Sequence, residues 1–95
     1  MHILATDDEA LSLDSLTVTL QKAFPHAEVH SFQQPRKALD FVRFLCQRQN
    51  TSLDFAFLDV EMPGMTGIEL AAELKKLCPD VGIFFVTGFA DYAYE

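Results

Sequence analysis

Basic residues are scarce in this 95-residue chain: seven Lys and Arg stand against 14 Asp and Glu, which gives a net charge of −7. Such a charge repels phosphate backbones, so we expect no direct contact between this chain and nucleic acid. It favours divalent cations or a basic partner surface instead. The 49% hydrophobic content and nine Phe can fill a compact core, which argues against intrinsic disorder.

Features of exported and membrane proteins are also missing. The two cysteines, Cys46 and Cys78, fall in helical patterns and suggest no disulfide framework, so we expect both to be reduced and mostly buried. No apolar run approaches the roughly 20 residues that a membrane-spanning helix needs. The N-terminus has no signal-peptide pattern. We therefore expect a soluble, cytoplasmic protein without membrane contact.

Short apolar runs alternate with longer helical patterns along the chain. We expect strands at residues 3–6, 28–32, 55–58 and 81–86. The last two runs are apolar throughout, as in strands that helices cover on both faces. Apolar residues at helical spacing predict helices over residues 13–24, 35–45 and 68–77, and residues 89–95 resemble the start of another.

This alternation of strands and helices predicts a parallel sheet built from right-handed crossovers. The fold class is therefore α/β, with a doubly wound sheet. Ninety-five residues allow one small domain at most.

Three carboxylates follow two of these strands. Asp7 and Asp8 come directly after the first strand, and Asp59 closes the third, before a turn that contains Pro63 and Gly64. The carboxyl ends of parallel strands meet at one edge of the sheet, which is where open α/β sheets bind ligands. We therefore expect the three side chains to lie together.

Converging carboxylates repel one another, by about 4 kcal/mol for a pair ~4 Å apart at an effective dielectric constant near 20. The protein can respond by raising a pKa or by binding a hard cation such as Mg²⁺. A carboxylate in such a site can also attack phosphorus. Thr87, at the end of the fourth strand, could donate its hydroxyl to a phosphoryl oxygen, and Gly88 leaves room for that group.

Three motifs occur in order, each at the carboxyl end of an expected strand: Asp7-Asp8-Glu9, Asp59-x-x-Met62-Pro63-x-x-x-Gly67 and Thr87-Gly88. Together they resemble the receiver domain of bacterial response regulators over essentially the whole chain. The resemblance implies a flavodoxin-like sheet in the order 2-1-3-4-5. Residues 1–95 would then be a C-terminally incomplete receiver domain. Residues 85–95 resemble receivers that are joined to LytTR-type DNA-binding domains.

The resemblance also implies a role for each site residue. Asp59 would accept a phosphoryl group from a sensor histidine kinase, and the domain would catalyse at most its own phosphorylation and dephosphorylation. Asp8, Asp59 and the backbone carbonyl of Glu61 would ligate Mg²⁺, and Asp7 would hold the ion through water. Thr87 would contact the phosphoryl group and act as the switch. An output DNA-binding domain outside this chain would then control transcription.

The chain departs from the family pattern after its fourth expected strand. The family's fifth strand, its phosphate-pairing lysine and its last helix are absent, and Lys75 and Lys76 belong to the third helix, so they cannot substitute. A charge-assisted hydrogen bond contributes about 1.5–3 kcal/mol, so phosphate retention should weaken. The apolar edge at residues 83–86 would be exposed, which predicts dimerisation or strand exchange unless the chain is part of a longer regulator. Glu61 and Phe89 occupy positions that tune the lifetime of the acyl phosphate in the family.

Other interpretations of the same residues stay open. Asp7-Asp8-Glu9 could cap a helix, Asp59 could be an ordinary turn residue, and Thr87 could be a plain strand-end hydroxyl. The histidines show no sensible ligand geometry, and we expect solvent-facing or structural roles for His2, His26 and His30.

Two other functions compete with a phosphorylated receiver. One is a receiver-like interaction module that does not switch, because the lysine is absent. The other is an aspartate-nucleophile phosphohydrolase. Such enzymes resemble Asp-x-Asp-x-Thr, whereas the run from Asp59 to Pro63 lacks the second Asp and the Thr.

Overall fold

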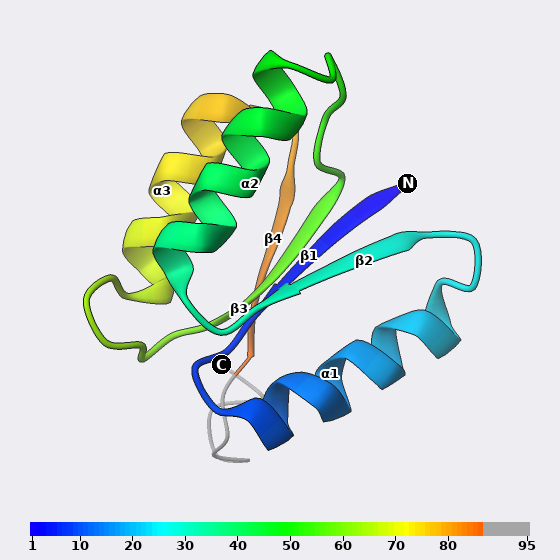
Figure 1. Ribbon diagram of the computed structural model, residues 1–95, viewed down its shortest axis with the longest axis vertical. Coiled ribbons are helices and arrows are strands. Elements are labelled where there is room, and N and C mark those ends of the chain that lie inside the picture. The colour runs from blue at the N-terminus through cyan, green and yellow to red at the C-terminus, as the bar shows by residue number, and fades with distance from the viewer. Residues whose placement is uncertain (87–95) are drawn as a thin grey trace.

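The expected strands pair into one parallel sheet in the order β2-β1-β3-β4 (Figure 1). A computed structural model describes residues 1–86 of the chain. The order is the one that the flavodoxin-like doubly wound fold predicts for its first four strands, so the predicted fold class is confirmed. The strands are β1 (His2–Thr6), β2 (Glu28–Phe32), β3 (Phe55–Asp59) and β4 (Gly82–Val86).

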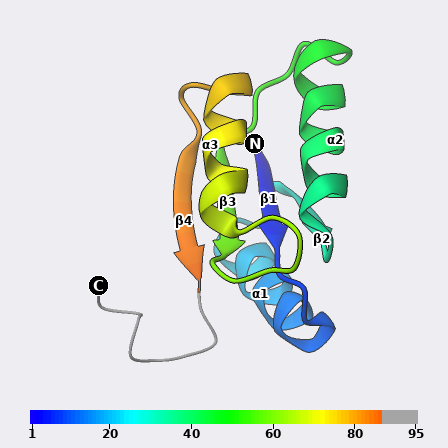
Figure 2. The ribbon, with the colours of Figure 1, turned by 90° about the vertical axis from the view of Figure 1, so that its left-hand side faces the viewer.

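Helices cover the sheet unevenly. One face carries α1 (Ala10–Ala23), which lies over β1 and β2, and the other carries α2 (Pro35–Gln47) and α3 (Gly67–Leu77) (Figures 1 and 2). Proline shapes the ends of these elements as the sequence predicts. Pro35 fills the first turn of α2, where its missing N–H costs no helical hydrogen bond.

The core has two layers because strand side chains alternate between the faces of the sheet. In β1, Leu4 packs toward α2 and α3, while Ile3 and Ala5 pack toward α1. The layer under α2 and α3 is the larger one. It contains 13 buried residues, among them Leu4, Val42 and Leu58.

One expectation about coverage is wrong. The apolar run of β3 predicted helices on both of its faces, but only Ala56 and Leu58 are fully buried. Phe55 and Phe57 face the α1 side and are only partly buried, because α1 lies over β1 and β2. In β4, Phe84 and Phe85 are 47% and 48% exposed.

The two cysteines are free, and Cys78 is buried while Cys46 is partly buried. Their sulfur atoms lie 2.8 Å apart. Burial and the neighbouring Cys78 raise the pKa of Cys46 to about 11, so this thiol is protonated at neutral pH.

Three expectations concern residues after Val86. Thr87, Phe89 and the helix expected from residue 89 lie outside the described residues. Among residues 1–86, no helix is both long enough and apolar enough to cross a membrane.

Candidate functional site

Asp7, Asp8 and Asp59 meet at the carboxyl edge of the sheet. One carboxylate oxygen from each lies within 4.8 Å of the others. The parallel register of β1 and β3 causes this meeting, because it pairs Thr6 with Leu58 and so brings the next residues of the two strands side by side. The juxtaposition that the sequence predicted is therefore present.

The three carboxylates repel one another in the folded protein. The pKa of Asp59 is raised to about 6, first by burial and then by the charges of Asp7 and Asp8. A backbone hydrogen bond from Glu61 opposes this rise, because a donated N–H favours the ionised carboxylate. Neutral pH keeps the Asp59 carboxylate ionised, so the repulsion persists under ordinary conditions.

Backbone contacts hold Asp7 in place. Its side chain is almost buried, with the residue 9% exposed, and its Oδ1 accepts a hydrogen bond from the N–H of Glu9 at 2.9 Å. Its own N–H donates to the carbonyl of Phe32 at the end of β2. Glu9 is the N-cap residue of α1 but makes no side-chain capping hydrogen bond, so the helix-cap interpretation of this run is confirmed in position and wrong in the capping bond.

The loop after Asp59 is fixed by glycine and by a helix cap. The N–H of Gly67 donates to the carbonyl of Val60 at 2.9 Å, and a Cβ at position 67 would collide with the carbonyl of Asp59. Thr66 and Glu69 form a reciprocal capping box at the start of α3. The spacing Thr-x-x-Glu is a sequence signal for this cap, and it was missed.

A cavity of about 510 Å³ adjoins the carboxylates on the side of α2. Asp8 lines it together with Gln33, Gln34, Pro35, Arg36 and Pro63. Arg36 brings a positive charge to the cavity beside Asp8, and the sequence analysis did not identify it. Its position just after β2, the neighbour of β1, is the signal that could have found it.

The other predicted site residues differ in what the structure says of them. Glu61 is exposed beside the site, and ligation by its carbonyl stays a prediction. Thr87 lies outside the described residues. Lys75 donates to the carbonyl of Val81 at 2.6 Å and Lys76 pairs with Glu73 at 2.9 Å. Lys75 thus contacts the residues after α3, and Lys76 contacts α3 itself. Both lysines lie away from the carboxylates, as predicted.

Comparison with known proteins places this arrangement in a family. Residues 3–95 match the response regulator receiver domain. The chain belongs to the response regulator receiver family. Receiver domains are signalling modules. The match over residues 3–95 confirms the resemblance that the sequence motifs indicated.

Relatives of this receiver include the sensory transduction protein LytT of Bacillus subtilis, which is 30% identical over 95 residues. The alignment covers 100% of this chain and 37% of LytT, so the chain spans a little over a third of that relative's length. The transcriptional regulatory protein LytR of Staphylococcus aureus is 28% identical over 95 residues, which are 36% of its length.

Solved structures share the receiver fold. A two-component transcriptional regulator AraC from Clostridium phytofermentans superposes with a TM-score of 0.76 at 29% identity, over 100% of this chain and 73% of that chain. TrrA from Thermotoga maritima, solved with Mg(2+)-BeF, gives a TM-score of 0.72 at 29% identity, over 99% and 75%. TrrA in complex with the histidine kinase ThkA gives 0.73 at 30%, over 96% and 72%.

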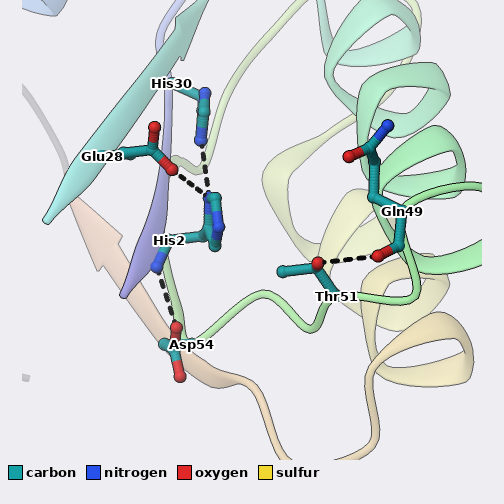
Figure 3. Close-up of polar contacts among 6 residues, drawn as sticks. All are labelled: His2, Glu28, His30, Gln49, Thr51 and Asp54. Carbon is teal, nitrogen blue, oxygen red and sulfur yellow. Dashed lines mark hydrogen bonds and ion pairs between the residues drawn. The ribbon is translucent and has the colours of Figure 1, made fainter.

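The structure overturns one expectation about the histidines. His2, His30 and Glu28 each place one donor atom within 4.8 Å of the others, which is a sensible ligand geometry (Figure 3). The sequence gives no signal for this cluster because the residues come together only through the pairing of β1 with β2. Burial, then the charge of His2, lowers the pKa of His30, while Glu28 opposes the shift.

Proposed function

We propose that this receiver is phosphorylated on Asp59 by a sensor histidine kinase in a reaction that depends on Mg²⁺. The observation that carries the proposal is the meeting of Asp7, Asp8 and Asp59 at the carboxyl edge of a receiver-family sheet. TrrA, solved in complex with the kinase ThkA, supports a kinase as the donor.

The geometry suits Asp59 as the nucleophile. It is the last residue of β3, and its carboxylate is ionised at neutral pH because a pKa of about 6 lies below that pH. In the proposed step a carboxylate oxygen of Asp59 bonds to phosphorus while the phosphorus–nitrogen bond of a phosphohistidine breaks. The bond electrons leave with the imidazole, which takes up a proton.

The donor set fits a hard divalent cation. Three carboxylate oxygens within 4.8 Å, one of them on Asp59, whose pKa is raised by burial and then by its neighbours, form a concentrated negative charge that Mg²⁺ neutralises. Asp7, Asp8 and Asp59 would hold the ion, with the carbonyl of Glu61 as a further ligand. When bound, Mg²⁺ lowers the charge that an incoming phosphoryl group meets.

The remaining roles are part of the same proposal. Thr87 contacts the phosphoryl group and acts as the switch, and the output is a DNA-binding domain outside this chain; the likeness to the transcriptional regulatory protein LytR supports an output in transcription. The domain works in the cytoplasm and catalyses at most its own phosphorylation and dephosphorylation. That residues 1–95 form a receiver domain without its fifth strand stays a prediction.

A small phosphodonor tests the proposal without knowledge of the kinase. The chain is mixed with acetyl phosphate and Mg²⁺, and we expect one base-labile phosphate per molecule. Asp59→Asn should abolish this uptake, and removal of Mg²⁺ with a chelator should reduce it strongly. Asp14→Asn is the matched control, because Asp14 is an exposed carboxylate on α1 and should leave the uptake unchanged.

Other outcomes identify the competing functions. Multiple turnovers of the donor would support the phosphohydrolase. An absence of uptake, in a longer chain as well as this one, would support the interaction module. One observation favours the interaction module: the phenylalanines of β4 are about half-exposed and could bind a partner.

A further inference from the structure

A second group of potential metal ligands, drawn in Figure 3, lies where β1 and β2 begin, at the end of the sheet opposite the carboxylates. His2 opens β1 and pairs with Glu28, which opens β2. His30 follows Glu28 by two residues, so both side chains lie on the same face of β2. That face is the one under α2, because the ring of His30 packs 4.5 Å from the ring of Phe41.

Two of the three distances between these donor atoms are close to those between ligands of one ion, and the third is within 4.8 Å. Nδ1 of His2 lies 3.0 Å from Nε2 of His30 and 3.3 Å from Oε2 of Glu28. Tetrahedral Zn²⁺ with ligands at about 2.0–2.1 Å requires ligand atoms about 3.4 Å apart. A small movement of the side chains would therefore place all three donor atoms on one ion.

Hydrogen bonds alone satisfy this cluster poorly. The Nδ1 atom of His2 faces both a carboxylate and an imidazole nitrogen, yet a neutral ring nitrogen carries either one hydrogen or one lone pair. It can donate well to one partner only, or accept from His30 while its lone pair faces the Glu28 carboxylate. A cation between the three atoms accepts all of their lone pairs at once.

The surroundings orient the ligands and leave the site accessible. The rings of His2 and His30 are nearly parallel, with an angle of 13° between their planes, and the backbone N–H of His2 donates to Oδ2 of Asp54 at 2.8 Å. The hydrogen bond to Asp54 holds the backbone of His2 in place at the start of β1. The side chain of Glu28 is 69% exposed, so an ion and a completing water molecule can enter from solvent.

We propose that His2, Glu28 and His30 form a site for a borderline divalent transition cation, with Zn²⁺ as the expected ion. Imidazole nitrogens favour Zn²⁺, whereas Mg²⁺ favours an all-oxygen set such as the carboxylates at the other edge. The two edges of one sheet would therefore hold different cations. A bound ion would join β1 to β2 and raise the unfolding temperature, since it binds the folded chain.

Equilibrium dialysis of the untagged chain against Zn²⁺, in excess Mg²⁺, tests this proposal. The background carries Cys46→Ser and Cys78→Ser, because two adjacent thiols could also take Zn²⁺. We expect one Zn²⁺ per chain. Replacement by Co²⁺ should give the visible absorption of a tetrahedral ion without a thiolate band.

Variants of the ligands then locate the ion. His30→Gln and Glu28→Gln should each weaken Zn²⁺ binding at least tenfold and abolish the rise in unfolding temperature. Glu28→Gln protects against a folding artefact, because this exposed side chain is replaced without loss of core packing. His26→Gln is the matched control, since His26 is exposed and outside the cluster, and it should bind Zn²⁺ as the parent does.

Asp59→Asn separates this site from the carboxylate site. It should lose phosphate uptake but keep Zn²⁺, so failure of one proposal can be told from failure of the other. The proposal is overturned if the parent chain takes up no Zn²⁺, or if His30→Gln and Glu28→Gln bind it as tightly as the parent. In either case the contacts of His2 with His30 and Glu28 are structural only.

Discussion

At the scale of single residues, Asp59 shows how a functional carboxylate costs stability. Its pKa of about 6 in the folded chain exceeds its ordinary value of 3.8, so the folded state holds a proton more tightly than the unfolded state. Stability must then fall as pH rises through this interval. The cost is relieved when the carboxylate is neutralised, whether by a proton, a substitution or a bound cation.

The first prediction follows from this sign. In the absence of divalent cations, Asp59→Asn should unfold at a higher urea concentration than the parent near neutral pH. The difference should shrink as pH falls and vanish below about pH 3, where the carboxylate is protonated in both states. Urea unfolding monitored by circular dichroism measures it. Asp14→Asn should behave as the parent at each pH, and a destabilised Asp59→Asn at neutral pH would contradict the prediction.

Thr6 carries a second residue-scale cost. Its residue is fully buried at the end of β1, and among the described residues its Oγ1 has no hydrogen-bond partner. A buried hydroxyl without a partner costs about 1–3 kcal/mol, so the nearly isosteric Thr6→Val should raise the free energy of unfolding by about 1 kcal/mol.

Urea denaturation of Thr6→Val, at a pH where the carboxylates are ionised, measures this gain. Thr17→Val is the control, because Oγ1 of Thr17 donates to the carbonyl of Leu13 at 2.7 Å and lies 2.6 Å from Oγ of Ser31. That substitution removes satisfied contacts and should lower stability by about 0.5–1.5 kcal/mol. Equal losses in the two variants would show that the Thr6 hydroxyl is satisfied.

At the scale of elements, the junction between β3 and α3 positions the site. Gly67 is the first residue of α3, and it is needed for space rather than for an unusual backbone angle. A Cβ there would meet the carbonyl carbon of Asp59 at 2.9 Å and Cα of Val60 at 3.2 Å. Gly64 differs, because its φ is +84° and nothing lies within 4 Å of an added Cβ.

We therefore expect Gly67→Ala to displace the backbone of Asp59, to lower the free energy of unfolding by about 3 kcal/mol, and to reduce phosphate uptake at Asp59. Gly64→Ala should cost only about 1–2 kcal/mol, from the left-handed backbone, and keep the uptake. Urea unfolding and the acetyl phosphate assay on both variants separate the two effects. A Gly67→Ala chain as stable and active as the parent would refute this account of the junction.

Element positions were largely predictable, and contacts between distant elements were not. The proline at residue 35 and those after the first and third helices marked helix ends, and β2 lies where its alternation predicted. Helix α1 starts at Ala10, three residues before the first periodic leucine. This start was predicted too late because the N-cap residue of α1 gives no sequence signal. The carboxylate site was predictable since each member follows a strand, but the ligand group around His30 depends on the register of β1 with β2.

At the scale of the whole molecule, the two edge strands of the described sheet, β2 and β4, differ in how well they are covered. The edge at β2 is flanked by α1 and α2, whereas β4 presents Phe84 and Phe85 to solvent with nearly half of each residue exposed. An apolar edge strand is a template for pairing with another chain. The net charge of −7 opposes such pairing, and salt screens that repulsion.

We predict that the 95-residue chain self-associates through residues 83–86, and more strongly as ionic strength rises. Sedimentation at several salt concentrations measures this. Phe85→Lys should return the chain to a monomer, because a charged side chain blocks edge pairing. Phe44→Lys is matched to it, since Phe44 is 50% exposed on α2, and should associate like the parent. A monomer at high concentration and high salt would exclude the prediction.

The central place of β1 also determines when each site can assemble during synthesis. Its partner β2 begins 26 residues after His2, but its partner β3 pairs Phe55 with Ile3, across 52 residues. The ligands of the proposed Zn²⁺ site have all been synthesised by residue 30, whereas the carboxylate site is incomplete until Asp59 has been added. Parallel pairing over such separations is slow, so a cation captured early by β1 and β2 would hold the central strand in register until β3 arrives.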